Sequence, residues 1–449
     1  MNTAPVLEFL RQALISLTEH CKADGVPRGT LATSFEGDGW RTKFRDVPRW
    51  DLAVWRCFSS TKLFELPIAA DAASAIWAVG PFPGWKVHLT ADKSSEEARP
   101  WAIHSLMPVL IDYLQMVGES RFDQTAMREV LERHIANWTA AEQLDEVSVP
   151  LFGLHCELDE IRFDEHTSIE LFSQEKKEFL WSQWQAELGI VDILPFGQSQ
   201  YRIRAVADRP RPRLNSSLAP TISRCEHVII ALRLLKDGEL FSGGVFIEAL
   251  PPIIDSPIAS RLLVESRHGG IKIGASFELA STELPSLVSL YSHIHSICAE
   301  GKAKSLELAL RRFVMSQSRE REEDSIIDLA ISLESSLLAD AGSELAFQFA
   351  TRGTAILADT WNGAECYALL KAFYSARSRI VHSGKTLDEL CSSGKLGRRN
   401  VHEFVALCRR ATREILRFYL DRVTSGVALK DVNREVEDLI VQRVGALNA

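Results

Sequence analysis

The segment Ala364–Lys385, AECYALLKAFYSARSRIVHSGK, holds the residues of this chain best suited to chemistry. Its apolar residues recur with helical spacing, and Arg377, Arg379 and His382 come just before Ser383-Gly384. An arginine beside a histidine can hold a phosphodiester and move its protons, because the guanidinium stays charged while the imidazole titrates near neutrality. The pattern therefore indicates phosphodiester chemistry at the end of one helix.

The spacing sets a geometric condition on that chemistry. His382 lies five positions after Arg377, which turns an ideal helix through about 500° and leaves the two side chains about 140° apart. Arg379 and His382 are three residues apart and share a face. Two arrangements would bring Arg377 and His382 to one phosphate. One is a distortion of the helix end near Gly384, and the other is a symmetric dimer in which two copies of the motif face each other across a cleft.

The charge distribution sets this segment apart from the rest of the chain. The net charge is −9, but residues 371–420 hold eleven Lys/Arg and four Asp/Glu, a balance of +7, so the remainder sums to −16. A cationic block within an acidic protein is typical of a localised nucleic-acid footprint. It is equally typical of a solvated helix face, and charge alone does not separate the two interpretations.

Composition and length predict a cytoplasmic globular protein of more than one domain. The chain has 449 residues, 46% of them hydrophobic and 25% charged. Charge throughout the first twenty residues predicts no signal peptide, and the most apolar stretch, residues 66–87, is too interrupted to cross a membrane. The eight scattered cysteines form no CxxC pair, which argues against a zinc ribbon or a disulfide framework. We expect no metal and no cofactor.

The periodicity predicts an α+β multidomain protein. Residues 1–145 form a mostly helical region of unknown role, with helices over 6–21, 103–117 and 124–139 and with loops or short strands over 37–55 and 79–93. Residues 146–283 form a mainly β domain with a sensor or regulatory role. Its expected strands include YRIRAV, HVIIALRLL, LFSGGVFIEAL and IKIGASFELA, with one inserted helix over 174–188 and a Pro/Arg loop over 207–218.

Residues 284–449 predict an antiparallel helical bundle. The expected helices cover 284–299, 303–317, 323–339, 343–359, 364–382, 398–422 and 428–445. Gly342, Gly363, Gly384 and Gly397 lie between successive helices as stop signals. Glu334, in an apolar stripe of this bundle, is expected to pair with Arg352 or Arg377, because a buried charge needs a partner.

The C-terminal third resembles the HEPN superfamily, and most closely its ApeA-like branch. The resemblance covers roughly residues 300–425 and rests on ALRRFVMSQSREREEDSIIDLAISLESSLL, SELAFQFATRGTAIL and LKAFYSARSRIVHSG. The family's defining element, an Arg followed by a polar residue and later by a His, matches Arg377, Ser378 and His382, with four residues between Arg and His. PLFGLHCELDEIRF and ALRLLKDGELFSGGVF resemble, less specifically, the domain that often precedes such bundles.

The resemblance implies a metal-independent endoribonuclease, a hydrolase of a family that often acts as a toxin or in antiviral defence, and a homodimer formed through the bundle. RNA carries its own nucleophile, the 2′-OH, so the protein need only position it, move protons and stabilise charge. His382 suits proton transfer and Arg377 suits the phosphate clamp. Ser378 is expected to orient the phosphate or His382. The expected RNA-phosphate contacts are Arg379, Lys385, Arg398 and Arg399.

The spacing Arg-x4–6-His also matches Arg99/His104, Arg128/His134 and Arg261/His268, so context rather than spacing selects the 377/382 pair. His293-x-His295 would bind a metal only on an extended chain, and its surroundings predict a helix. His402 either approaches His382 as a second acid/base or packs on the bundle surface.

Two functional hypotheses follow. In the first, the bundle dimerises and cleaves RNA, and the N-terminal regions sense a trigger, whose identity the sequence does not give. In the second, the bundle is a non-catalytic dimerisation and nucleotide- or RNA-binding module, in which Arg377 and His382 form interface salt bridges.

Overall fold

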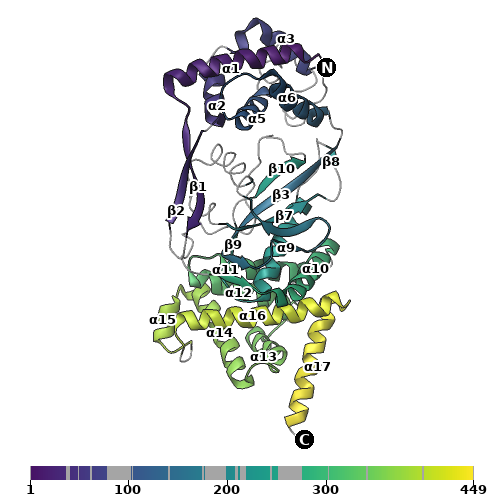
Figure 1. Ribbon diagram of the computed structural model, residues 1–449. Helices are drawn as coiled ribbons and strands as arrows, with labels where there is room; N and C mark the ends of the chain where they lie inside the picture. The colour runs from purple at the N-terminus through teal and green to yellow at the C-terminus, as the bar shows by residue number, and fades with distance from the viewer. Residues whose placement is uncertain are drawn as a thin grey trace. The chain divides into compact units, whose positions relative to one another are not determined.

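The computed structural model shows a mixed α+β protein with a helical C-terminal region (Figure 1). It describes residues 2–36, 41–48, 50–60, 63–77, 103, 105–139, 142–173, 176, 199–207, 211–212, 219–242, 245–250, 276–301, 303–339, 342–396 and 399–447. The chain forms two compact units. The first contains Met1–Pro150, Glu170–Ile222 and Gly244–Ser260, and the second contains Leu151–Ile169, Ser223–Gly243 and Arg261–Ala449.

The N-terminal part of the first unit is mostly helical. Its helices are α1 (Ala4–Asp24), α2 (Trp50–Ser60), α3 (Pro67–Trp77), α5 (Leu106–Val117) and α6 (Gln124–Thr139). They bury one apolar core that includes Phe9, Phe58 and Tyr113. The helices expected over 6–21, 103–117 and 124–139 are confirmed. The antiparallel hairpin of β1 (Arg28–Glu36) and β2 (Arg41–Pro48) begins earlier than the loops or short strands expected over 37–55.

The central region contains short strands. They are β3 (Glu142–Phe152), β4 (Leu154–Cys156), β5 (Glu160–Arg162), β6 (Thr167–Leu171), β7 (Tyr201–Val206), β8 (Arg211–Pro212), β9 (Phe241–Ser242), β10 (Phe246–Leu250) and β11 (Phe277–Leu279). Among the described residues, the largest sheet has the order β10-β3-β7-β6-β5, with β8 and β9 also paired to β3. β10, β8 and β9 all run antiparallel to β3, whereas β11 runs parallel to β4.

One expected strand is wrong. HVIIALRLL lies in helix α9 (Ala219–Leu235), not in a strand. This helix is apolar on nearly every side: Val228, Ile229, Ala231 and Leu232 are all buried. A helix buried all round loses the 3.6-residue periodicity that would distinguish it from a buried strand. The helix expected over 174–188 lies almost entirely outside the described residues. Within the loop expected over 207–218, Arg211 and Pro212 pair with β3.

A buried ion cluster links three strands of the sheet. The Glu146 carboxylate on β3 accepts two hydrogen bonds from arginines on β7. Arg202 Nη1 donates to Glu146 Oε1 at 2.7 Å, and Arg204 Nε donates to Glu146 Oε2 at 2.6 Å. Arg202 Nε also donates to Glu170 Oε1 on β6 at 2.8 Å. Burial raises the pKa of Glu146, but Arg202, Lys176 and Arg204 outweigh it and lower the pKa to about 2. Glu146 is therefore held ionised inside the sheet.

The C-terminal region follows the expected helices closely. It contains α10 (Leu284–Glu300), α11 (Lys304–Gln317), α12 (Glu322–Leu337), α13 (Leu345–Leu357), α14 (Gly363–Ser383), α15 (Leu387–Ser392), α16 (Val401–Thr424) and α17 (Leu429–Leu447). The short helix α15 was not expected. Gly363 is not a stop signal as predicted, because it is the first residue of α14, where Asn362 accepts hydrogen bonds from the Ala364 and Glu365 amides. Gly342 lies between α12 and α13, and Gly397 lies outside the described residues.

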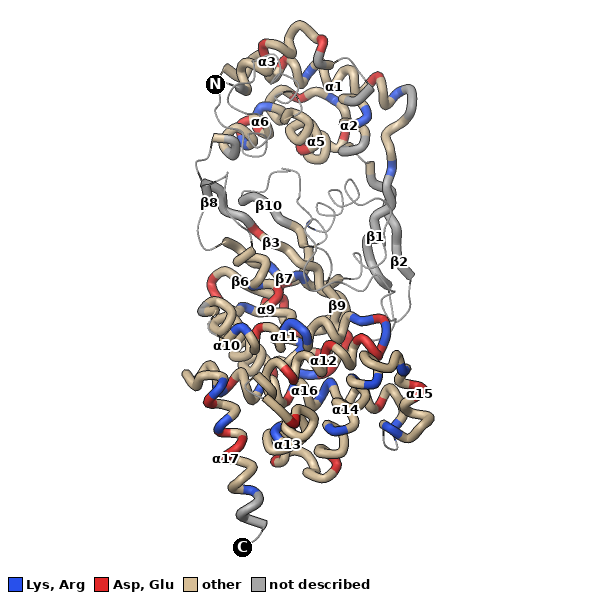
Figure 2. The backbone as a smooth tube through the Cα atoms, turned by 180° about the vertical axis from the view of Figure 1, so that it is seen from behind, with Lys and Arg blue, Asp and Glu red and all other residues tan. Residues whose placement is uncertain are grey.

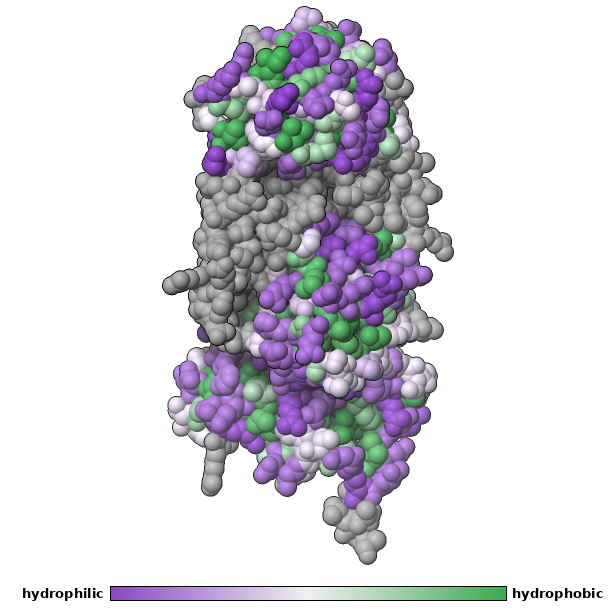
Figure 3. All heavy atoms as spheres, viewed as in Figure 1, coloured by the Kyte–Doolittle hydropathy of each residue, from purple (hydrophilic) through white to green (hydrophobic). Residues whose placement is uncertain are grey.

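Helix α12 is the central element of this region. It packs against α11, α13, α14 and α16, and the buried side chains Ile326, Leu329, Ala330, Leu333 and Leu337 provide its contacts. On the face shown in Figure 3, hydrophilic and hydrophobic residues are interspersed over the described residues. No helix of the described residues combines the length and apolar character needed to cross a bilayer.

Candidate functional site

Helix α14 carries the predicted motif at its C-terminal end. Its buried stripe consists of Cys366, Leu369, Leu370, Phe373 and Ala376, which recur with the period of a helix that packs on one side. The helix ends at Gly384, whose φ of 60° is the left-handed conformation that glycine adopts most easily. The Gly384 amide donates to the Ile380 carbonyl at 3.2 Å, and the Lys385 amide donates to the Arg379 carbonyl at 3.4 Å. The motif is therefore built on a regular, capped helix.

Arg377 lies against α12 rather than in open solvent. It follows Phe373 by four residues, which places it only about 40° around the helix from that buried ring. Arg377 Nη2 donates to Glu334 Oε2 at 3.3 Å, and the two side chains are 24% and 23% exposed. Burial raises the pKa of Glu334, and Arg377 opposes that rise. Of the two partners expected for Glu334, the structure selects Arg377; Arg352 instead pairs with Glu437 at 2.6 Å.

His382 lies on the solvent side of the same helix. It follows Phe373 by nine residues, which places it about 180° from the buried ring, and its side chain is exposed. Arg379, one turn earlier, is also exposed, and its Nε donates to Ser375 Oγ at 3.3 Å. Ser378 is half-buried. An exposed imidazole and an exposed guanidinium on adjacent turns can both reach one bound phosphate.

The expected RNA-contacting residues beyond the helix are Lys385, Arg398 and Arg399. Lys385 is exposed and forms an ion pair with Glu389 at 3.4 Å. Arg399 is half-buried, and its carbonyl accepts a hydrogen bond from Cys391 Sγ at 3.4 Å. Arg398 lies outside the described residues. The chain after the motif is also tied to α12, because the Leu387 amide at the start of α15 donates to Glu323 Oε1 at 3.0 Å.

Arg377 and His382 do not share a face of the chain. Helix α14 continues unbroken through Ser383, so the distortion near Gly384 that would have brought them together is not present. Arg377 points towards α12, while His382 and Arg379 face solvent. Of the two arrangements that the spacing leaves open, the structure does not show the first, a distortion of the helix end.

The cationic block is partly neutralised by carboxylates. Arg377 pairs with Glu334, Lys385 with Glu389, Arg410 with Glu414 at 2.8 Å, and Arg413 with Asp237. Figure 2 shows Lys and Arg beside Asp and Glu on α14, α15 and α16. Arg379 and Lys385 are both exposed, and each lies three residues from His382 in the sequence. Fewer unpaired positive charges therefore lie in residues 371–420 than the net charge of +7 indicates.

Of the other Arg-x4–6-His spacings, only Arg128/His134 falls within the described residues. Within the described residues, His134 on α6 is buried and its Nε2 lies 2.8 Å from Asp112 Oδ2. The pairs Arg99/His104 and Arg261/His268 lie outside the described residues.

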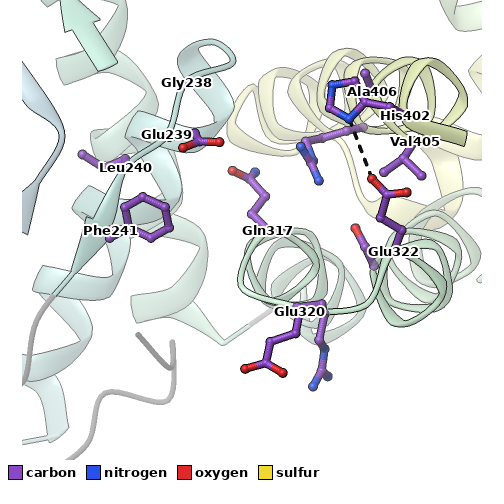
Figure 4. A pocket seen from close by; sticks show the side chains of 13 residues that line it. Gly238, Glu239, Leu240, Phe241, Gln317, Glu320, Glu322, His402, Val405 and Ala406 are labelled. Atoms are coloured by element: carbon purple, nitrogen blue, oxygen red, sulfur yellow. Dashed lines mark ion pairs between the residues drawn. The ribbon is translucent and has the colours of Figure 1, made fainter. Parts of the chain in front are cut away.

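His402 lies beside a carboxylate of α12. It is 86% exposed on α16, and its Nδ1 is 3.7 Å from Glu322 Oε1 on α12. Both residues line a cavity of about 360 Å³, which the loop Gly238–Phe241 closes on the opposite side (Figure 4). This cavity was not predicted from the sequence, although His402 and Arg409 have the seven-residue spacing that places two side chains on one helix face.

His293 and His295 are on α10 and diverge, as the helical prediction requires. His293 Nδ1 lies 3.5 Å from Asp421 Oδ1, whereas His295 Nδ1 lies 3.2 Å from His227 Nδ1 on α9. Burial, with His295 and Arg224 nearby, lowers the pKa of His227 to about 3, so this imidazole is neutral. Within the described residues, no group of three or more His, Cys, Asp or Glu side chains is placed to hold a metal ion.

No protein-family model, curated protein or solved structure matches this chain.

Proposed function

We propose that this protein is a metal-independent endoribonuclease of the HEPN type that cleaves RNA through the 2′-hydroxyl. We further propose that it acts in the cytoplasm as a regulated toxin or antiviral effector. One observation carries the proposal: His382 and Arg379 lie exposed on adjacent turns at the capped end of α14. An imidazole that can exchange a proton and a permanent cation beside it are the groups that this reaction needs.

The proposed reaction is an internal displacement at phosphorus. His382 accepts the proton of the 2′-OH as the 2′-oxygen attacks the phosphorus atom, and the bond from phosphorus to the 5′-oxygen breaks. The leaving oxygen takes a proton from an imidazolium or from water, so the products are a 2′,3′-cyclic phosphate and a free 5′-hydroxyl. Arg379 stabilises the negative charge that develops on the phosphoryl oxygens, and Ser378 orients the phosphate.

Arg377 has a constrained role in this proposal. Its Nη2 is bonded to Glu334, so it reaches a phosphate only with its other amino group or after exchanging partners. The end of α14 offers one imidazole, that of His382, although the reaction needs a base and an acid. A symmetric dimer that brings two α14 ends to one cleft would supply both groups.

The test uses the full-length protein with end-labelled single-stranded RNA in EDTA. We expect cleavage that produces 2′,3′-cyclic phosphate ends, and no cleavage of the same sequence carrying 2′-deoxy sugars. His382→Ala should lower the rate at least about 100-fold, the scale of general acid–base catalysis. His155→Ala is the matched control, since His155 is an exposed histidine on β4.

Equal cleavage by wild type and His382→Ala would contradict the proposal. Size-exclusion chromatography and circular dichroism must show that the two proteins share one oligomeric state and fold. Cleavage by a strictly monomeric protein would contradict the dimeric arrangement while leaving the 2′-hydroxyl chemistry intact.

A second function is favoured by the ion pair between Arg377 and Glu334. An arginine paired between two helices fixes their relative position in the bundle. Such a structural role supports a non-catalytic dimerisation and nucleotide- or RNA-binding module. This module would bind RNA without forming product. Growth arrest on overexpression that His382→Ala relieves would favour the enzyme over the module.

A further inference from the structure

Phe347, in the first turn of α13, is an exposed aromatic residue on the helix that packs against the motif helix. It is 56% exposed, and α13 lies against α14 (Figure 1). A single exposed ring is ordinary on a protein surface. Its position relative to the motif therefore decides whether it has a role.

Two contacts fix the register of α13 against α14. Phe349 lies against Tyr374, with ring centroids 5.2 Å apart, and a Cβ at Gly353 would lie 2.6 Å from Leu370 Cδ1. The partner on α14 moves back by four residues while α13 advances by four, so the two helices are antiparallel. Phe347 is therefore two residues, or about 3 Å, beyond Tyr374 towards the C-terminal end of α14.

Phe347 lies on the solvent side of α13, at the edge next to α14. It is about 160° around the helix from Phe349, whose ring is buried. Thr354 is only about 20° from Phe347, and the Thr354 side chain is hydrogen-bonded to Cys366 of α14. The Phe347 ring is therefore exposed along the line where the two helices meet.

Four residues of α14 form a strip on its outward side. They occur at positions i, i+3, i+7 and i+11, lie within about 80° of one another, and are Lys371, Tyr374, Ser378 and His382. Lys371 and His382 are exposed, and the other two are half-buried. Phe347 is level with the stretch between Tyr374 and Ser378. An aromatic ring thus lies between the exposed lysine and the exposed histidine, and we call these five residues the aromatic strip.

Both ends of the aromatic strip carry exposed positive charge. Lys371 is exposed, and among the described residues no carboxylate forms an ion pair with it. At the other end Arg379 is exposed, and its Nε donates to the neutral Ser375 hydroxyl at 3.3 Å. The two cations are eight residues apart, or about 12 Å along the helix. Proteins bind single-stranded nucleic acid with such an arrangement, because bases stack on the ring and phosphates pair with the cations.

We propose that the aromatic strip binds the nucleotides of single-stranded RNA that adjoin the cleaved phosphate. Phe347 stacks on a base, and Lys371 pairs with a phosphate farther along the strand. The RNA then lies along α14, with the cleaved phosphate at Arg379 and His382. This inference rests on the proposed function and extends it from the reacting phosphate to the neighbouring bases.

Charge favours RNA over a second copy of the chain as the occupant of the aromatic strip. A polyanion neutralises Lys371 and Arg379, whereas a symmetric contact through the strip would bring the same cations of two copies together. A base stacks on an aromatic face but not on an aliphatic side chain. Substitutions of Phe347 can therefore separate stacking from simple burial.

The experiment measures the affinity of the full-length protein for an oligouridine of about twelve 2′-O-methyl nucleotides by fluorescence anisotropy. This ligand lacks the 2′-hydroxyl nucleophile, so binding is measured whether or not the protein cleaves RNA. Phe347→Ala and Phe347→Leu should each weaken binding about tenfold, whereas Phe347→Trp, which keeps an aromatic face, should bind within about twofold of wild type. Leu345→Ala removes an apolar side chain 40% exposed on the same helix and should bind as wild type does.

Two further measurements locate the RNA on the strip. Lys371→Met should weaken binding and lower the slope of log affinity against log salt by about 0.7, the value for one phosphate contact. Lys430→Met, at an exposed lysine of α17, is the matched control and should leave the slope unchanged. An abasic nucleotide at the stacked position should weaken binding to wild type about tenfold and to Phe347→Ala no further.

Four results would overturn the inference. They are the absence of binding by wild type, unchanged affinity in folded Phe347→Ala and Lys371→Met, wild-type affinity in Phe347→Leu, and loss of a dimer in Phe347→Ala without loss of RNA affinity. The last result would assign the strip to a contact between copies. The proposed function fails separately, because it is contradicted when wild type binds the 2′-O-methyl ligand but does not cleave unmodified RNA.

Discussion

Arg377 and Glu334 connect the motif helix to the central helix of the C-terminal region, with 3.3 Å between Arg377 Nη2 and Glu334 Oε2. Because Arg377 is only about 40° from the buried face of α14, its side chain reaches α12 before it reaches solvent. The residue that the motif assigns to the phosphate is thus also a structural contact.

The first prediction concerns the strength of this pair. A double-mutant cycle with Glu334→Ala and Arg377→Met should give a coupling free energy of about 0.5–1 kcal/mol, since both side chains keep some solvent contact. Urea unfolding of the four proteins measures it. Coupling indistinguishable from zero would mean that the pair does not fix the contact between α12 and α14.

The second prediction concerns the pH dependence of Glu334. Burial raises its pKa in the folded state above the unfolded value, so its stabilising contribution is complete below the unfolded pKa and is lost as pH rises through the folded pKa. The stability of wild type relative to Glu334→Gln should therefore fall on going from pH 4 to pH 7. Urea midpoints of both proteins at both pH values test this. A stability of wild type relative to Glu334→Gln that rises from pH 4 to pH 7 would contradict the prediction.

The third prediction concerns Glu146, whose pKa is lowered on folding, whereas that of Glu334 is raised. Its folded-state pKa is lowered to about 2, so its contribution is present above the unfolded value of 4.5 and is lost as pH falls towards 2. Glu146→Gln should cost roughly 3 kcal/mol at neutral pH, and this deficit should shrink steadily below pH 4.5. Glu160, an exposed carboxylate on β5, provides the control Glu160→Gln, with an expected change within about 0.5 kcal/mol.

The fourth prediction uses the two glycines at the ends of α14. Gly384 has a φ of 60°, so Gly384→Ala should destabilise by about 1 kcal/mol through backbone strain alone, because nothing lies within 4 Å of an added Cβ. Gly363 also has open space but no positive φ. Gly363→Ala should leave stability unchanged or raise it by up to about 1 kcal/mol. Destabilisation of equal size at both positions would contradict the assignment of Gly384 as the left-handed cap.

The fifth prediction concerns RNA binding. Under the proposed function, Arg379→Ala and Lys385→Ala should each lower affinity for single-stranded RNA and reduce the salt dependence by about 0.7 per lost phosphate contact. Fluorescence anisotropy across a range of salt concentrations gives the slope. Arg434→Ala, which removes a cation 74% exposed on α17, should leave the slope unchanged. If Arg379→Ala and Lys385→Ala also left the slope unchanged, the RNA contacts would lie elsewhere.

The C-terminal helices could be predicted from sequence because each buries one clear stripe. In α14, residues 366, 369, 370, 373 and 376 recur with the helical period, and the predicted limits differ from the observed ones by one residue. Helix α9 was predicted wrongly because Val228, Ile229, Ala231 and Leu232 are all buried, which removes the contrast between faces that periodicity needs. Gly363 was predicted wrongly because the side chain of Asn362, rather than the glycine, determines that helix boundary.

The motif residues could be identified from sequence, but their surroundings could not. Glu334 had two expected partners, and only the packing of α12 against α14 selects Arg377 over Arg352. The cavity could not be predicted, because Glu239, Ser325 and Arg409 come from segments far apart in the chain. Their proximity results from tertiary packing.

Helix α12 holds the motif segment at both of its ends. Glu334 bonds to Arg377 before the turn, and Glu323, eleven residues earlier and about 16 Å away along the helix, bonds to the Leu387 amide after it. These two contacts restrain the segment that carries His382 relative to α12. Under the proposed function, His382 would be controlled by a movement of α12, by shielding of the imidazole, or by the approach of a second surface.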